Sequence, residues 1–217
     1  MAMKRKGSRF KNREEAGLLL SRKLRKYKNR EVVIYAIPRG GVVTASIIAK
    51  NLNAPLDLII TRKIGHPRNP EYAVSAVSEN GYLIKTNELE SINPNWIKEE
   101  VKRQQQEITR RKKTYLKGKN KVHAKGKIAI LVDDGIATGL TTRAAIEELK
   151  HKEPNKIVVA TPVISKSTKE LIEKEADEIV ALKIISNEEF SSIGSFYENF
   201  SQVSDKEVIK LSRGERT

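Results

Sequence analysis

The segment IAILVDDGIATGLTT, residues 128–142, joins a short apolar run to two acidic residues and then to a loop of small and hydroxyl side chains. A short run of branched apolar residues is typical of a strand buried on both faces of a parallel sheet. Residues 140–150 have a helical pattern, so the loop connects a strand to a helix. In such sheets ligands bind beyond the carboxyl ends of the strands, and this loop is therefore the first candidate site.

The loop has the chemistry of a phosphate cradle with an acidic pair at its entrance. Gly135 and Gly139 permit unusual backbone angles, and N–H groups at the start of the following helix can point at an anion. Asp133 and Asp134 would repel phosphate, so their expected partners are ribose hydroxyls or Mg²⁺. A plain strand-to-helix turn capped by one aspartate is the alternative, but a cap needs one short polar residue, not two acids and a glycine–threonine loop. The glycine–lysine pattern of P-loop nucleotide hydrolases and the glycine spacing of dinucleotide-binding loops are both absent from the sequence.

The rest of the chain alternates strand and helix patterns. Strands are expected at residues 32–37, 56–61, 127–132, 157–163 and 178–184, and helices at 12–27, 42–52, 94–116, 140–150 and 167–175, with a last short helix from residue 205. Two further short strands, 73–78 and 82–85, are expected to pair as a hairpin around Asn80-Gly81. This alternation predicts right-handed βαβ units around a parallel sheet, and hence an α/β fold.

Residues 132–141 resemble the signature of the type I phosphoribosyltransferases, which bind phosphoribosyl pyrophosphate (PRPP). The tail FYENFSQVSD, residues 196–205, resembles a subgroup whose acceptor is unassigned. The resemblance implies a twisted parallel sheet flanked by helices, with a small hood over the carboxyl ends of the strands. It also implies a single domain over residues 1–217, with a mobile basic tail at 1–11, a lid loop and hairpin at 62–85, and a candidate hood at 164–205.

The same resemblance implies which residues hold PRPP. The 5-phosphate would be bound by Ala137, Thr138, Gly139, Leu140 and Thr141. Pyrophosphate would be bound by Arg39, Gly40, Gly41, Arg62 and Lys63, and the Arg39–Gly40 bond is a candidate cis peptide. The candidate catalytic residues are Asp133, Asp134, Arg62 and Lys63, and the two aspartates are also candidate Mg²⁺ ligands beside PRPP itself.

The acceptor is expected under the hood. Phe196 and Tyr197 are candidates to stack on a flat acceptor, with packing inside the hood as an equal alternative. Ala137 stands where relatives that act on 6-oxopurines carry an acidic residue, which places hypoxanthine and guanine in doubt and leaves the acceptor open.

The resemblance therefore implies Mg²⁺-dependent transfer of 5-phosphoribose from PRPP to a small nitrogenous acceptor, with release of pyrophosphate. A homodimer is usual in the family, and the role would lie in nucleotide metabolism. Two alternatives are a PRPP-binding regulator that contacts nucleic acid through basic segments, which no nucleic-acid-binding motif supports, and a degenerate binding module.

Composition and charge limit the partners, the chemistry and the location that the sequence allows. The net charge is +15, and residues 1–30 hold 12 basic against 2 acidic side chains while residues 98–127 hold 12 against 3. A solvated lysine-rich surface is the plainer interpretation of these segments, because aromatic residues form only 5% of the chain.

The absence of cysteine excludes disulfides, thiolate metal sites and cysteine nucleophiles. The longest uncharged stretch is only 40–49 and no segment suits a signal peptide, so we expect a cytoplasmic protein without a membrane span.

Overall fold

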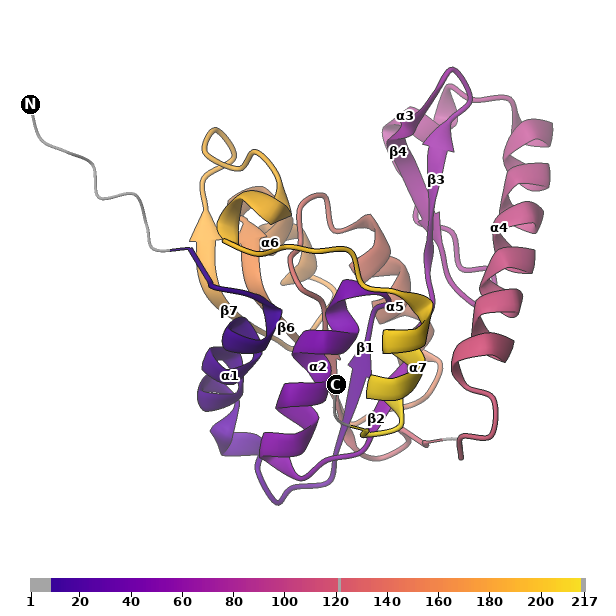
Figure 1. Ribbon diagram of the computed structural model, residues 1–217. Coiled ribbons are helices and arrows are strands. Elements are labelled where there is room, and N and C mark those ends of the chain that lie inside the picture. Colours follow the sequence, from indigo (N-terminus) through magenta and orange to yellow (C-terminus); the bar gives the residue numbers. More distant parts are fainter. Residues whose placement is uncertain (1–8, 121, 216–217) are drawn as a thin grey trace, which may run out of the picture.

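A parallel five-stranded sheet lies at the centre of the molecule (Figure 1). The computed structural model describes residues 9–120 and 122–215. In spatial order the strands are β2 (Leu56–Leu58), β1 (Val32–Ala36), β5 (Ile128–Val132), β6 (Lys156–Ser165) and β7 (Glu178–Ile185). The expected α/β class and the parallel sheet are confirmed.

Helices cover both faces of this sheet. They are α1 (Arg13–Lys23), α2 (Gly40–Leu52), α5 (Leu140–Lys150), α6 (Lys166–Ile172) and α7 (Asp205–Ser212). Two further helices, α3 (Asn87–Glu90) and α4 (Pro94–Tyr115), contact the residues at 62–77 instead, and there are short 3-10 helices at η1 (Arg25–Tyr27) and η2 (Ile193–Phe196). Alternate strand residues point to opposite faces. Accordingly, Val32 and Ile34 pack in the core beneath α1, α2 and α7, whereas Val33 and Tyr35 pack beneath α5 and α6. No helix in the described part of the chain is long and apolar enough to span a bilayer.

The order of the strands creates a switch point between β1 and β5. From β1 the chain moves outward to β2, whereas β5, β6 and β7 follow one another on the other side of β1. At such a point the chain leaves the two neighbouring strands in opposite directions, which creates a crevice at their carboxyl ends. The two loops that meet here are residues 38–41 and 133–139, both of which the sequence indicates as binding loops.

A two-stranded hairpin stands beside the sheet and lies along α4 (Figure 1). β3 (Arg62–His66) pairs antiparallel with β4 (Asn69–Val77). Residues 62–66 of the expected lid are thus a strand through their pairing with β4, and Ile64 is fully buried in the main core. The hairpin expected around Asn80-Gly81 is present only as a short turn with a bridge between Val77 and Leu83, since β4 takes β3 as its main partner.

The residues after β7 return across the loops at the strand ends (Figure 1). Tyr197 forms a parallel bridge with Phe10, and the Glu198 N–H donates to the Phe10 carbonyl at 2.8 Å. The basic tail expected at 1–11 is thus fixed from residue 9 onward, and its residues 1–8 lie outside the described chain. Within the candidate hood at 164–205, residues from two places contact the loop at 133–139. Thr168 and Ile172 of α6 lie against Gly139, and Ile193, after β7, lies against Gly135.

Candidate active site

The two glycine-containing loops touch at the switch point. A Cβ added to Gly40 would overlap the Asp134 carboxylate, and one added to Gly41 would lie 2.9 Å from the Val132 carbonyl oxygen. Only glycine therefore allows the 38–41 loop to pack directly on the acidic pair. The peptide bond in the cis form is Pro38–Arg39, one bond earlier than the Arg39–Gly40 bond expected from the sequence.

Asp134 is buried and held by residues from both ends of the described chain. Arg13 Nε donates to Asp134 Oδ2 at 2.5 Å, and the two side chains are only 10% and 11% exposed. Arg13 Nη1 also donates to the Ser201 carbonyl at 2.8 Å, and the guanidinium carbon lies 3.7 Å from the centre of the Phe200 ring. The Tyr197 hydroxyl donates to the Asp134 carbonyl oxygen at 2.6 Å. One carboxylate of the pair is therefore already neutralised by an arginine.

Asp133 is in a different electrostatic environment. Burial, followed by the neighbouring charge of Asp134, raises its pKa well above the ordinary value, and the positive charge of Lys63 opposes the rise. Its Oδ1 accepts the Asp134 backbone N–H at 2.8 Å. Because Asp134 is committed to Arg13, Asp133 is the member of the pair that is left to meet a ligand hydroxyl or a cation.

Hydrogen bonds from β6 and α6 hold the glycine–threonine loop at 135–141, and Thr138 at its tip is exposed. The Ala137 carbonyl accepts hydrogen bonds from the hydroxyls of Ser165 and Thr168, which belong to β6 and α6. Gly139 precedes α5 with a φ of 72°, a left-handed conformation that favours glycine, and no side chain caps the helix. The uncapped N–H groups of the first turn of α5 are thus available to an anion.

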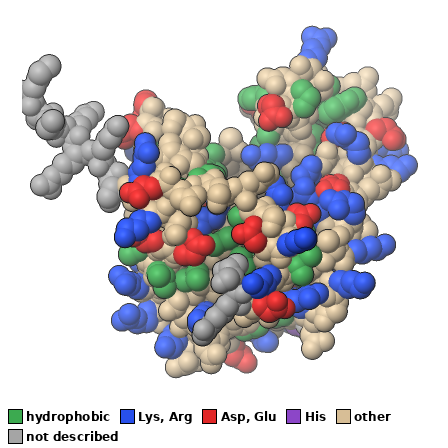
Figure 2. Space-filling model, in the orientation of Figure 1, with side chains coloured by type: hydrophobic (Ala, Val, Ile, Leu, Met, Phe, Trp, Pro, Cys, Tyr) green, Lys and Arg blue, Asp and Glu red, His purple; other side chains and the backbone are tan. Residues whose placement is uncertain are grey.

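The hairpin brings its basic residues to the same edge. Arg62 and Lys63 line a cavity of about 720 Å³ together with Pro38 of the first loop and Thr141 of the phosphate loop. Burial and then the charge of Arg111 lower the pKa of Arg62. The space-filling view shows a notch between the hairpin and the lobe that contains α6 (Figure 2). This cavity joins Arg62 and Lys63 to Thr141, and beside it Gly40 and Gly41 pack against the acidic pair.

Two predicted side chains are engaged elsewhere. Arg39 lies 3.7 Å from Asp205 at the start of α7, so its guanidinium is turned towards the tail. Tyr197 is only 3% exposed and its ring contacts Phe10 and Phe200, which corrects the expectation that it stacks on an acceptor. The alternative, packing inside the hood, is the arrangement found. Phe196 is half-buried against Phe190 and keeps part of its ring exposed.

Sequence reasoning missed two contributors to this edge of the molecule. Arg13 lies 121 positions from Asp134, and nothing local distinguishes it from the other basic residues of the N-terminal segment. The sequence predicts helix α4 but not its role as a wall of the cavity through Trp96, Arg103 and Arg111. In the described residues no group of three or more acidic, histidine or cysteine side chains could hold a metal ion.

Together the parallel sheet, the glycine–threonine loop and the acidic pair at the switch point define an α/β protein with a candidate site at the carboxyl edge of its sheet. The model of the phosphoribosyl transferase domain matches residues 11–195, and the chain belongs to this family. The family expected from the sequence is thus confirmed.

Relatives agree with this assignment. Two curated Mycobacterium tuberculosis proteins, from strains CDC 1551 and H37Rv, are provisionally named phosphoribosyl transferases and are each 34% identical over 211 residues, which is 95% of this chain and 47% of theirs. The chain therefore spans about half the length of the curated relatives it matches. The crystal structure of TT1426 from Thermus thermophilus has a TM-score of 0.79 and 35% identity, covering 94% of this chain and 97% of that one. AQ2163 from Aquifex aeolicus, with a TM-score of 0.50 and 12% identity over 80% of this chain and 75% of that one, shows the fold alone.

Proposed function

We propose that this chain transfers 5-phosphoribose from PRPP to a small nitrogenous acceptor and releases pyrophosphate. The observation that carries the proposal is the direct packing of the 38–41 loop on the acidic pair, next to the uncapped start of α5. This arrangement offers separate places for a 5-phosphate, for ribose hydroxyls and for a pyrophosphate leaving group within one crevice.

The roles follow from charge. The N–H groups and hydroxyls of residues 137–141 would anchor the 5-phosphate, and Asp133 would accept hydrogen bonds from the ribose hydroxyls. Arg62 and Lys63 would stabilise the negative charge that develops on departing pyrophosphate. Transfer at the anomeric carbon passes through an oxocarbenium-like transition state, so positioning and electrostatics would supply the rate enhancement without a protein nucleophile.

Magnesium fits this site as a companion of PRPP. Asp134 is bonded to Arg13, so Asp133 is the carboxylate that would contribute to Mg²⁺ binding, with the remaining ligands from PRPP oxygens and water. When bound, the ion would supply charge neutralisation on the pyrophosphate group. Our proposal also includes the homodimer and the cytoplasmic location that the family resemblance implies.

The basic segment at 98–127 gives less support to the nucleic-acid-binding alternative. Several of its cations are paired within the molecule: Arg103 with Glu100, Arg110 and Arg111 with Glu107, Lys112 with Glu79, and Lys125 with Glu153. The charge that could meet a nucleic-acid backbone is therefore smaller than the composition indicates.

The test is an activity search by mass spectrometry. Purified protein is incubated with PRPP, Mg²⁺ and a deproteinised metabolite extract, and the Asp133→Asn variant serves as the matched control. Protein-dependent loss of PRPP with a new phosphoribosylated mass, absent in the variant, is the expected result and identifies the acceptor. Calorimetry that detects no PRPP binding by the wild-type protein would overturn the proposal.

A further inference from the structure

Arg39 lies between two residues that face the candidate site, but its own side chain is turned away. Pro38 lines the cavity of the site, and a Cβ on Gly40 would overlap the Asp134 carboxylate. The Arg39 guanidinium instead lies with Nη1 3.7 Å from Asp205 Oδ1. Among the described residues Asp205 is the only ion-pair partner of Arg39.

Asp205 is held in place by a second contact. It is the first residue of α7, which packs against both α2 and α4 (Figure 1). The hydroxyl of Tyr115, at the end of α4, donates to Asp205 Oδ1 at 2.7 Å, and Tyr115 is only 1% exposed. Burial, and then this hydrogen bond, raise the pKa of Tyr115 to about 12, so its hydroxyl remains a donor at neutral pH. The carboxylate is therefore fixed, and Arg39 is the partner that can leave.

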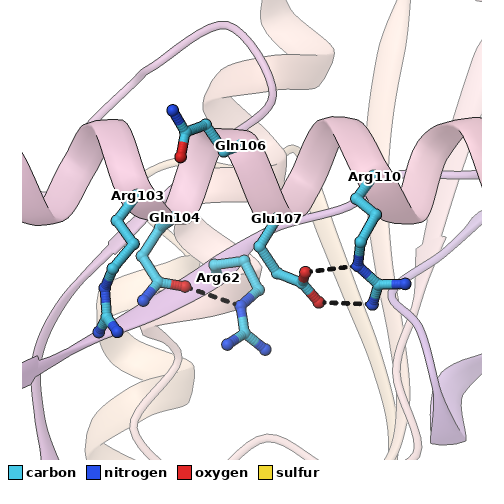
Figure 3. A pocket seen from close by; sticks show the side chains of 6 residues that line it. All are labelled: Arg62, Arg103, Gln104, Gln106, Glu107 and Arg110. Carbon is cyan, nitrogen blue, oxygen red and sulfur yellow. Dashed lines mark hydrogen bonds and ion pairs between the residues drawn. The ribbon is translucent and has the colours of Figure 1, made fainter.

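The ion pair between Arg39 and Asp205 is weak. Its 3.7 Å separation exceeds the roughly 2.7–2.9 Å of a charge-assisted hydrogen bond, and the two side chains are 33% and 45% exposed. Pairs that solvent reaches in this way contribute little. By contrast, Arg62 Nε donates to Gln104 Oε1 at 2.9 Å, which fixes that guanidinium against α4 (Figure 3). A ligand would therefore draw Arg39 out of its present contact more easily than Arg62.

The charge of the site explains why Arg39 is turned outward. Arg62 and Lys63 already line the cavity, and a further guanidinium beside them would be repelled. Asp205, which does not line the cavity, gives Arg39 an anionic partner outside it. A pyrophosphate group carries several negative charges and can accept two parallel hydrogen bonds from one guanidinium, so it is the stronger partner of the two.

We propose that Asp205 is a positioning residue that holds Arg39 away from the site and competes with the pyrophosphate group of PRPP for its guanidinium. When PRPP binds, Arg39 exchanges the Asp205 carboxylate for phosphate oxygens. The affinity for PRPP is therefore reduced in proportion to the fraction of molecules in which Arg39 is paired with Asp205. This inference rests on the proposed function, because it requires PRPP at the switch point. It gives the tail at 196–205 a role besides its support of Asp134.

The test is a calorimetric titration of PRPP with Mg²⁺ into the full-length wild type, D205N, R39Q, the double variant R39Q/D205N and the control E198Q. Asparagine keeps an oxygen that can accept from the Tyr115 hydroxyl, so the contact between α7 and α4 is retained. We expect D205N to bind PRPP about two- to fivefold more tightly, because a solvent-exposed pair sequesters Arg39 by about that factor. Glu198 is an exposed carboxylate of the same tail, and E198Q should bind within about 1.5-fold of wild type because solvent screens its charge.

The double variant separates competition for Arg39 from a general effect of charge. In the R39Q background D205N should change the affinity by less than about 1.5-fold, because no guanidinium remains to be released. Tighter binding caused by D205N in both backgrounds would show general repulsion of the ligand and overturn the proposal, and so would unchanged or weaker binding by D205N alone. Damage to the fold does not imitate the expected result, because it weakens binding.

The same titrations distinguish this inference from the proposed function. A wild-type protein that does not bind PRPP would refute the transfer reaction and the role of Asp205 together. Binding of PRPP by the wild type without the gain in D205N would refute the role of Asp205 alone.

Discussion

Substitution of Arg13 by methionine tests the buried ion pair that holds Asp134. The variant retains most of the apolar stem but leaves Asp134 without its cation and the Ser201 carbonyl without its donor. Both charged side chains are about nine-tenths buried, so solvent screens the pair weakly. Removing one partner of a buried pair costs about 3–5 kcal/mol, and we expect a loss of that size in the free energy of unfolding.

The assay is urea unfolding followed by circular dichroism, arranged as a double-mutant cycle. Asp134→Asn removes the charge that Arg13→Met leaves unpaired. The loss in the free energy of unfolding caused by Asp134→Asn should therefore be at least about 1 kcal/mol smaller in the Arg13→Met background than in the wild type. Lys125→Met serves as a control because it breaks an exposed pair with Glu153 and should leave stability nearly unchanged. A loss below about 1 kcal/mol in Arg13→Met, the range of solvent-screened pairs, or strictly additive effects in the cycle would refute the reasoning.

Three further changes probe the same edge of the molecule and the helix beside it. Gly40→Ala places a Cβ on the Asp134 carboxylate, and calorimetry should show PRPP binding weakened at least about tenfold, whereas unchanged affinity would contradict the loop packing. Tyr197→Phe leaves the buried Asp134 carbonyl without its donor and should lower the free energy of unfolding in urea by about 1–3 kcal/mol; no loss would mean that water replaces the hydroxyl. Hydrogen bonding by Arg110 lowers the pKa of Glu107 to about 2, from an ordinary value of 4.5. Its stabilising contribution is therefore full above about pH 4.5 and is lost as the pH falls towards 2, so the difference in melting temperature between wild type and Glu107→Gln should shrink over that range. A constant difference would show that the Glu107 carboxylate does not titrate differently in the folded and unfolded protein.

The parts of the site that the sequence predicts are those encoded locally. The apolar run before Asp133, the two acids and the spacing of Gly135 and Gly139 all lie within one strand, one loop and one helix start. A parallel sheet then brings such loops to one edge without further information. The loop at 38–41 is placed for the same reason, because it follows β1, the neighbour of β5.

The parts that the sequence does not predict depend on contacts between distant segments. Pro94 and the preceding Asn93 mark where α4 begins, but the polar pattern of the helix does not say which face meets the hairpin. Tyr197 could stack on a ligand or pack in the hood, and only its contact with Phe10 decides between them. Likewise, the commitment of Asp134 to an arginine is invisible to any local pattern.

The contacts that hold Asp134 come partly from segments that are synthesised well after it. The loop that carries Asp134 is made long before Tyr197, which lies 63 positions later, and Ser201 follows still later. A nascent chain that has folded α1, β1 and β5 therefore has both binding loops but lacks the tail that fixes the acidic pair. A chain that stops after β7 would therefore keep the strands of its parallel sheet and lose the contacts that position Asp134.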